Sequence, residues 1–283
     1  MAAPRIPAPR TARTARPVGT VTRGTTNPNR LRRMDRWIAA THAGALRRSA
    51  DPVAVDLGYG AAPWTAVELL ARLRTVRPDA EVVGIEIDPA RVAAAGPYRR
   101  PGLDFAHGGF EVPLPDRDGR AGGERRPDLI RAANVLRQYD EGRVQDVWER
   151  LSARLAPDGL LVEGTCDEIG RRHVWVALGP EGPRTVTFAA RLGSLSRPSD
   201  LAERLPKALI HRNVPGEPVH AFLRDFDRAW AAAAPFADFG ARQRWIRSVR
   251  SIGDQWPLTD GPRRWRQGEV TVRWDALAPR TAR

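Results

Sequence analysis

The chain has 283 residues, a hydrophobic content of 42% and a formal net charge of +13. It is long enough to bury a sizeable core, whereas no apolar run is long enough to span a bilayer. The single cysteine, Cys166, excludes an internal disulfide and a cysteine zinc cluster, and we expect no metal site. Because the start also lacks the apolar centre of a signal peptide, we expect a cytoplasmic protein.

The positive charge raises the question of a nucleic-acid partner. Lysine occurs only once, at Lys207, and the excess of arginine, alanine, glycine and proline is typical of a GC-rich genome. Residues 1–26 contain prolines at positions 4, 7, 9 and 17 and no acidic residue. Since such prolines prevent a stable helix, this segment is predicted to be a disordered basic tail.

The central part of the chain alternates helices with short apolar strands. Residues 26–48 are predicted to form a first helix, with Asn27 as its cap and Pro28 in its first turn. Strands are predicted at 52–57, 80–88, 102–108, 127–136 and 157–165, with helices at 63–76, 88–95 and 141–155. Strands that alternate with helices at this spacing indicate a parallel sheet covered on both faces.

The pattern changes after Cys166. Residues 172–191 read as two alternating strands around a Gly-Pro turn, which predicts an antiparallel hairpin. Helices follow at 199–212, 219–234 and 241–252, and a last strand at 269–274. We therefore expect a Rossmann-like α/β core over 27–195 and a C-terminal helical elaboration with a returning strand over 196–283, which would form much of an acceptor pocket.

A glycine loop follows the first strand, with the order Asp56-x-Gly58-Tyr59-Gly60. The third glycine of a dinucleotide fingerprint is replaced by Pro63, and a kinase-type phosphate loop would need a lysine that is absent. A carboxylate at Asp56 would repel a pyrophosphate but suits a ligand with ammonium and sulfonium groups, such as S-adenosylmethionine. The glycines allow the backbone to approach such a ligand closely.

The order D-x-G-x-G resembles the first motif of class I S-adenosylmethionine-dependent methyltransferases, and the chain from about 53 to 165 resembles actinobacterial-type members of that superfamily. Glu86 ends the second strand, where a carboxylate accepts both ribose hydroxyls, and Ile87 would pack on adenine. Asp88 instead fits a helix cap before Pro89. Asn134 would lie beside the methionine part of the cofactor. The resemblance thus implies a Rossmann-like methyltransferase fold that binds S-adenosylmethionine.

The chain departs from this resemblance after the third strand. Many relatives carry an aspartate there that reads the adenine amino group, whereas Gly109 and Phe110 occupy that place in the segment HGGFEVPLP. We expect backbone groups, or the Phe110 ring packed on adenine, to substitute. The expected cofactor-binding residues are Asp56, Gly58, Tyr59, Gly60, Glu86, Ile87, Gly109, Phe110 and Asn134.

Methyl transfer requires mainly alignment, because the methyl group is already activated. Weak candidates for a catalytic role are Arg137, Tyr139 and Glu163, at the carboxyl ends of strands four and five, and His173, which could act as a base if the hairpin folds over the site. The leading interpretation is a methyltransferase for a small-molecule acceptor. Two alternatives stay open: an RNA methyltransferase that uses the basic tail, the C-terminal arginines and the pair Thr165-Cys166, or a cofactor-binding protein without catalysis.

Overall fold

The computed structural model describes residues 17–21, 24–115 and 125–280. Its centre is one sheet of eight strands in the order β3-β2-β1-β4-β5-β6-β7-β8. The strands are β1 Val53–Leu57, β2 Glu81–Glu86, β3 Leu103–His107, β4 Leu129–Ala133, β5 Leu160–Cys166, β6 Arg172–Gly179, β7 Gly182–Ala190 and β8 Glu269–Arg273. The pairs among β1 to β5 are parallel, and β6, β7 and β8 continue the sheet as antiparallel neighbours. The predicted Rossmann-like sheet with an antiparallel hairpin is therefore confirmed.

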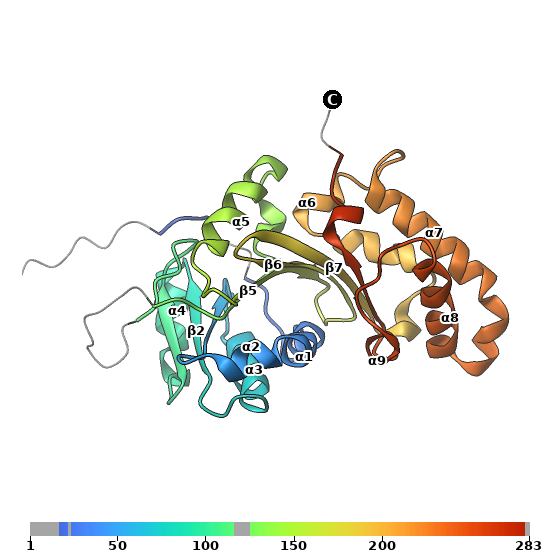
Figure 1. The fold of residues 1–283 in the computed structure, drawn as a ribbon. Coiled ribbons are helices and arrows are strands. Elements are labelled where there is room, and N and C mark those ends of the chain that lie inside the picture. The colour runs from blue at the N-terminus through green and yellow to red at the C-terminus, as the bar shows by residue number, and fades with distance from the viewer. Residues whose placement is uncertain (1–16, 22–23, 116–124, 281–283) are drawn as a thin grey trace, which may run out of the picture.

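Helices cover both faces of this sheet (Figure 1). The helices are α1 Arg32–Thr41, α2 Ala43–Arg48, α3 Trp64–Arg74, α4 Pro89–Ala95, α5 Val144–Ser152, α6 Lys207–Ile210, α7 Pro218–Ala232, α8 Ala241–Gly253 and α9 Pro262–Trp265. Apolar residues of α1 and α3 form one core with alternate residues of the strands, and those of α5, α7 and α8 form a second core on the opposite face. Strand side chains alternate between these cores, as the period of two requires.

Two predicted helices differ in the structure. The first begins at Arg32 and not at the predicted cap Asn27, because Asn29 has a left-handed φ of 62° that breaks a helix. The predicted helix 199–212 is a 3₁₀ segment Pro198–Arg204 followed by the short α6, since Pro206 interrupts it. The predicted cap of α4 is confirmed, with the Asp88 carboxylate accepting from the Ala90 amide at 2.9 Å.

The C-terminal segment joins the same sheet. Strand β8 pairs with β7 in antiparallel register, from Thr185 opposite Arg273 to Ala189 opposite Glu269. Phe188 of β7 packs on Phe222 of α7 with ring centroids 4.9 Å apart. The returning strand expected from the alternation near residue 270 is thus present at the edge of the sheet.

Candidate functional site

The glycine loop lies at the carboxyl end of β1. Gly58 and Gly60 have φ values of 68° and 87°, a conformation that glycine adopts without steric cost. The Gly60 amide donates to the Glu86 carboxylate at 3.0 Å, and the Ile87 amide donates to its other oxygen at 2.9 Å. The end of β2 therefore fixes the loop, and one buried carboxylate is aimed at the site.

Two cavities meet at this loop, and Gly58 lines both. The larger has a volume of about 520 Å³ and is lined by Asp56, Tyr59, Gly60 and Asn134 among others. The smaller, of about 20 Å³, is lined by Glu86, Ile87, Gly109 and Phe110 among others. All nine residues expected to bind the cofactor are thus brought together around two adjoining cavities at the carboxyl ends of parallel strands, where open α/β sheets bind ligands.

The Asp56 carboxylate does not stand alone at the larger cavity. It accepts from the Thr65 hydroxyl at 2.6 Å and from two nitrogens of the buried Arg131 guanidinium at 3.1 and 2.8 Å. Arg131 also contacts the buried Asp35, and its pKa rises because the two carboxylates outweigh the burial that would lower it. Two carboxylates thus share one guanidinium, so this cluster carries a net negative charge when both are ionised.

Asn134 directly follows β4 and has a left-handed φ of 61°. Its side-chain oxygen accepts from the Cys166 amide at 3.0 Å, and its side-chain nitrogen donates to the Cys166 sulfur at 3.1 Å. The residue therefore ties the tips of β4 and β5 together while it lines the larger cavity. Burial raises the pKa of the Cys166 thiol, which is 1% exposed, so the thiol stays protonated at neutral pH.

Part of the predicted tail packs on the site. The described residues 17–21 and 24–26, here called the N-terminal strap, contact both cavities. The Gly24 carbonyl accepts from the Ala61 amide at 2.9 Å, and the Thr26 hydroxyl donates to the Tyr59 carbonyl at 2.7 Å. The expectation of a disordered tail is therefore wrong for these residues, because hydrogen bonds hold Gly24 and Thr26 to the glycine loop and Val18 to the segment after β3. Residues 1–16 and 22–23 of that prediction lie outside the described residues.

The four weak catalytic candidates divide into two pairs. Arg137 lines the larger cavity and Tyr139 the smaller. Glu163 and His173 are buried in the sheet and line neither cavity. Burial raises the pKa of Glu163 to about 8 and lowers the pKa of His173 to about 3. Both are neutral at pH 7, and the His173 ring nitrogen contacts the Arg30 carbonyl at 3.0 Å, so this side chain supports the cavity wall from behind.

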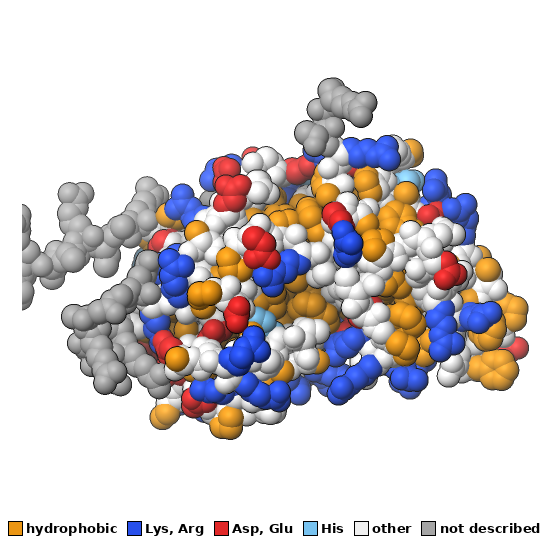
Figure 2. All heavy atoms as spheres, in the orientation of Figure 1, with side chains coloured by type: hydrophobic (Ala, Val, Ile, Leu, Met, Phe, Trp, Pro, Cys, Tyr) orange, Lys and Arg blue, Asp and Glu red, His pale blue; other side chains and the backbone are white. Residues whose placement is uncertain are grey.

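Sequence reasoning missed the other charged residues that line the larger cavity. These are Arg30, Arg204 and Glu168, which come from the segment before α1, from the 3₁₀ segment after β7 and from the loop after β5. No short motif contains them, and only their long-range packing places them together. On the face drawn in Figure 2, basic side chains are interspersed with acidic and apolar ones.

Comparison with known proteins supports the expected resemblance. No protein-family model matches the chain. Over 169 residues it is 31% identical to trans-aconitate 2-methyltransferase of Methylobacterium radiotolerans, which covers 57% of this chain and 59% of that protein. The chain therefore aligns with less than two thirds of this curated relative. The resemblance to methyltransferases predicted from the glycine loop is confirmed by this relative.

Solved structures with a partial likeness are also methyltransferases. Human N-acetylserotonin methyltransferase in complex with SAM is 20% identical, with a TM-score of 0.30 over 45% of this chain and 34% of that one. Magnesium protoporphyrin IX methyltransferase from Synechocystis PCC 6803 with bound SAH is 17% identical, with a TM-score of 0.34 over 47% and 53%. These scores are low, and the fold assignment rests on the strand order and register of the sheet itself.

Proposed function

We propose that this protein is an S-adenosylmethionine-dependent methyltransferase that acts on a small-molecule acceptor. The observation that carries the proposal is the contact between Glu86 and the Gly60 amide, which joins the end of β2 to a glycine loop flanked by Asp56. This is the arrangement that the resemblance to class I methyltransferases requires. The curated relative, a trans-aconitate 2-methyltransferase, supports the same class of reaction.

The residues present fit such a cofactor. Glu86 offers carboxylate oxygens that accept hydrogen bonds from a ribose diol, and such charge-assisted bonds are strong. Asp56 and Asp35 with Arg131 supply an excess of negative charge beside the loop, which suits an ammonium group. At Gly58 a Cβ would lie 2.9 Å from Val135 and φ is 68°, so glycine suits this position of the loop.

The bound cofactor supplies an activated methyl group, and the protein supplies position. Glu86 and the glycine loop would hold the nucleoside, and Asn134 would fix the rim of the larger cavity beside the methionine part. The larger cavity would hold the acceptor in line with the methyl group, because a near-attack geometry accounts for much of the rate. Cys166 is better explained as a buried structural residue than as the nucleophile of an RNA enzyme.

We also propose that the protein is located in the cytoplasm, and two features support this location. Among the residues that the structure describes, no helix is long and apolar enough to cross a membrane. The one cysteine is buried as a free thiol, which suits a reducing compartment.

Titration calorimetry with S-adenosylhomocysteine tests the proposal. We expect the wild type to bind it, and the Glu86→Ala variant to lose on the order of 2–4 kcal/mol of binding free energy, since two charge-assisted hydrogen bonds are removed. The control is Glu149→Ala, which removes an exposed carboxylate of α5 that lines neither cavity. Unchanged affinity in Glu86→Ala, or tighter binding of a nicotinamide dinucleotide, would contradict the proposal.

A further inference from the structure

The larger cavity has an excess of positive charge among its lining residues. Arg30, Arg137 and Arg204 line it, and the acidic lining residues are Glu168 and Asp56, which shares the Arg131 guanidinium with Asp35. Among the described residues, neither Arg30 nor Arg137 has a carboxylate within 4.0 Å of its guanidinium nitrogens. Within the part of the chain that the structure describes, two guanidinium groups therefore face the cavity without an ion-pair partner.

Backbone carbonyls hold two of the three arginines, Arg30 and Arg137, in place. Arg30 donates to the Asp167 carbonyl at 3.1 Å, and Arg137 donates to the Glu203 carbonyl at 3.2 Å. Carbonyl partners orient a guanidinium without neutralising it. Burial lowers the pKa of Arg137, and the adjacent charge of Arg204 lowers it further, which places two like charges close together.

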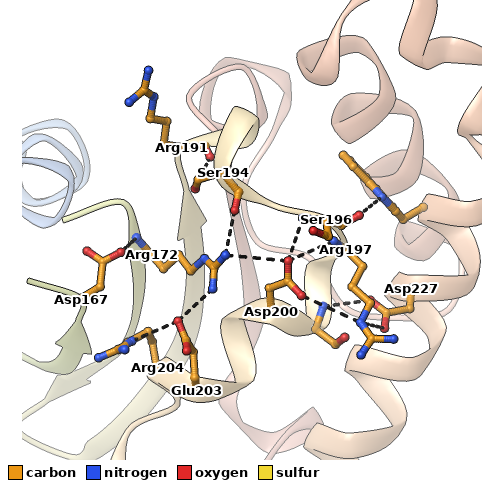
Figure 3. A network of polar contacts seen from close by, with 12 residues as sticks. Asp167, Arg172, Arg191, Ser194, Ser196, Arg197, Asp200, Glu203, Arg204 and Asp227 are labelled. Carbon is orange, nitrogen blue, oxygen red and sulfur yellow. Dashed lines mark hydrogen bonds and ion pairs between the residues drawn. The ribbon is translucent and has the colours of Figure 1, made fainter. Parts of the chain in front are cut away.

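Arg204 is presented by a segment that Arg172 fixes to the sheet (Figure 3). The Arg172 guanidinium donates to the Glu203 carboxylate at 2.9 Å and to the Ser194 carbonyl at 2.8 Å. Glu203 therefore divides its charge between Arg172 and the Arg204 nitrogen 3.4 Å away. The Arg172 guanidinium also lies 4.0 Å from the Asp200 carboxylate, so Arg204 shares Glu203 with an arginine that has a second acidic neighbour.

Resting on the proposed function, we propose that the acceptor is a small organic anion with at least two carboxylates, which Arg30, Arg137 and Arg204 bind, and that one carboxylate oxygen receives the methyl group. Guanidinium groups bind carboxylates with matched, two-point geometry.

The chemistry of this step suits the cavity. A lone pair of the carboxylate oxygen forms the new oxygen–carbon bond as the carbon–sulfur bond breaks, and that bonding pair stays on sulfur. A carboxylate anion and a sulfonium cation become a neutral ester and a neutral thioether, and no proton moves. The step therefore requires no general base, and Glu163 and His173, the buried candidates for one, lie outside the cavity lining.

The test is calorimetric titration of the protein, saturated with S-adenosylhomocysteine, with succinate, trans-aconitate, succinamide and inorganic phosphate. We expect the carboxylates to bind and neutral succinamide not to bind. Arg137→Gln should weaken carboxylate binding at least tenfold while S-adenosylhomocysteine affinity stays within twofold. The control is Arg150→Gln, which removes an exposed arginine of α5 outside the cavity.

The outcomes of these titrations distinguish the proposed function from the proposed class of acceptor. Failure to bind S-adenosylhomocysteine would overturn the proposed function, whereas normal binding of it with no carboxylate binding would overturn only the acceptor class. Binding of phosphate alone would also overturn the carboxylate assignment. With tritiated S-adenosylmethionine, a product that releases volatile labelled methanol in base supports an ester, and a base-stable label contradicts it.

The N-terminal strap also lines the smaller cavity and forms hydrogen bonds with its wall. The Val18 carbonyl of the N-terminal strap accepts from the Phe110 amide at 2.8 Å, and the Val18 amide donates to the Glu111 carboxylate at 2.9 Å. The Glu111 carboxylate is fixed by the Gly109 amide at 2.8 Å. The backbone of Val18 thus uses its carbonyl as an acceptor and its amide as a donor, and the cavity wall supplies the Phe110 amide and the Glu111 carboxylate as their partners.

An adenine ring presents the same pair of groups, an amino donor beside a ring-nitrogen acceptor. Gly19 lies where a Cβ would be 3.4 Å from Ile87 and 3.7 Å from Phe110, the residues expected to pack on adenine. The remaining volume of about 20 Å³ holds little more than one water molecule. The strap therefore fills the space that the proposed function assigns to adenine.

We infer that the strap is a reversible plug, in which Val18 occupies the hydrogen-bonding groups of Phe110 and Glu111 until adenine displaces it. This also rests on the proposed function. In this arrangement the Glu111 carboxylate would accept from the adenine amino group. Glu111 lies two residues after Gly109, in the segment where many relatives carry the aspartate that this chain lacks. If the strap were instead a lid that closes over bound cofactor, loosening the strap would weaken cofactor binding.

The test is Val18→Pro in the full chain, which removes the amide that donates to Glu111. The matched control is Val21→Pro, at an exposed strap residue whose amide has no partner among the described residues. We expect Val18→Pro to bind adenosine and S-adenosylhomocysteine at least fivefold more tightly, with faster association. Weaker or unchanged binding overturns the plug, and absence of binding in every variant overturns the proposed function. Hydrogen exchange at residues 18–20 should speed up when S-adenosylhomocysteine binds; added protection would contradict displacement.

Discussion

Arg131 makes a two-point contact with Asp56 inside the protein, with nitrogen–oxygen distances of 3.1 and 2.8 Å. Arg131 is 0% exposed and Asp56 is 2% exposed. The same guanidinium donates to the Thr65 carbonyl at 2.9 Å, so it links β4 with the start of α3 beneath the glycine loop. A buried charge of this kind is stable only when its partners are complete.

Replacing Arg131 by methionine is expected to destabilise the fold by about 3–5 kcal/mol, because Asp35 and Asp56 then remain buried without a counter-charge. Urea denaturation measures the change. In a double-mutant cycle with Asp56→Asn, we expect the combined cost to be clearly smaller than the sum of the single costs. Additive costs would show that the two side chains do not depend on one another.

This cluster shows what the sequence could not predict. The strand at β4 was expected from its apolar residues, but nothing in the local pattern indicates that Arg131 pairs with Asp35, which is 96 positions away. The glycine loop and Glu86 were predictable because a strand end and the following turn are local features. The strap was not, because its contacts use backbone groups of Val18 and Gly24, which a proline-rich composition does not encode.

Glu163 gives the protein a pH-dependent stability. Burial raises its pKa in the folded state to about 8 from an ordinary value of 4.5, with Trp148 opposing the rise. The folded state therefore holds a proton that the unfolded state releases between these values, so stability falls as pH rises from about 5 to 8. The slope for this group is about 1.4 kcal/mol per pH unit at most.

The variant Glu163→Gln isolates this effect. It keeps the shape of the neutral side chain and removes the titration, so its stability relative to the wild type should increase from pH 5.5 to pH 8. Urea denaturation of both proteins at the two pH values measures the difference. A constant difference across this range would mean that Glu163 titrates as an ordinary carboxylate.

The C-terminal segment is expected to be required for folding. Strand β8 pairs with β7, and apolar residues of α7 and α8 belong to the same core as those of β1 and β4. A chain ending at Leu195 would expose Phe188 and leave β7 as an open edge. We expect it to lose cooperative unfolding in circular dichroism, whereas a chain ending at Arg280 should unfold like the full chain. A stable, cooperatively folding fragment 1–195 would show instead that the two segments are separate domains.

Cys166 separates the small-molecule reading from the RNA alternative. The thiol is 1% exposed, its pKa is raised by burial, and its sulfur accepts from Asn134 at 3.1 Å. A serine hydroxyl can accept the same hydrogen bond, so Cys166→Ser should keep S-adenosylhomocysteine affinity within twofold, whereas Cys166→Ala leaves the Asn134 amide without this acceptor.

RNA binding by the arginine-rich chain should vanish near physiological salt, because it would rest on counterion release alone. Salt-resistant binding of a defined RNA, with labelled methyl transfer abolished by Cys166→Ser, would favour the RNA enzyme.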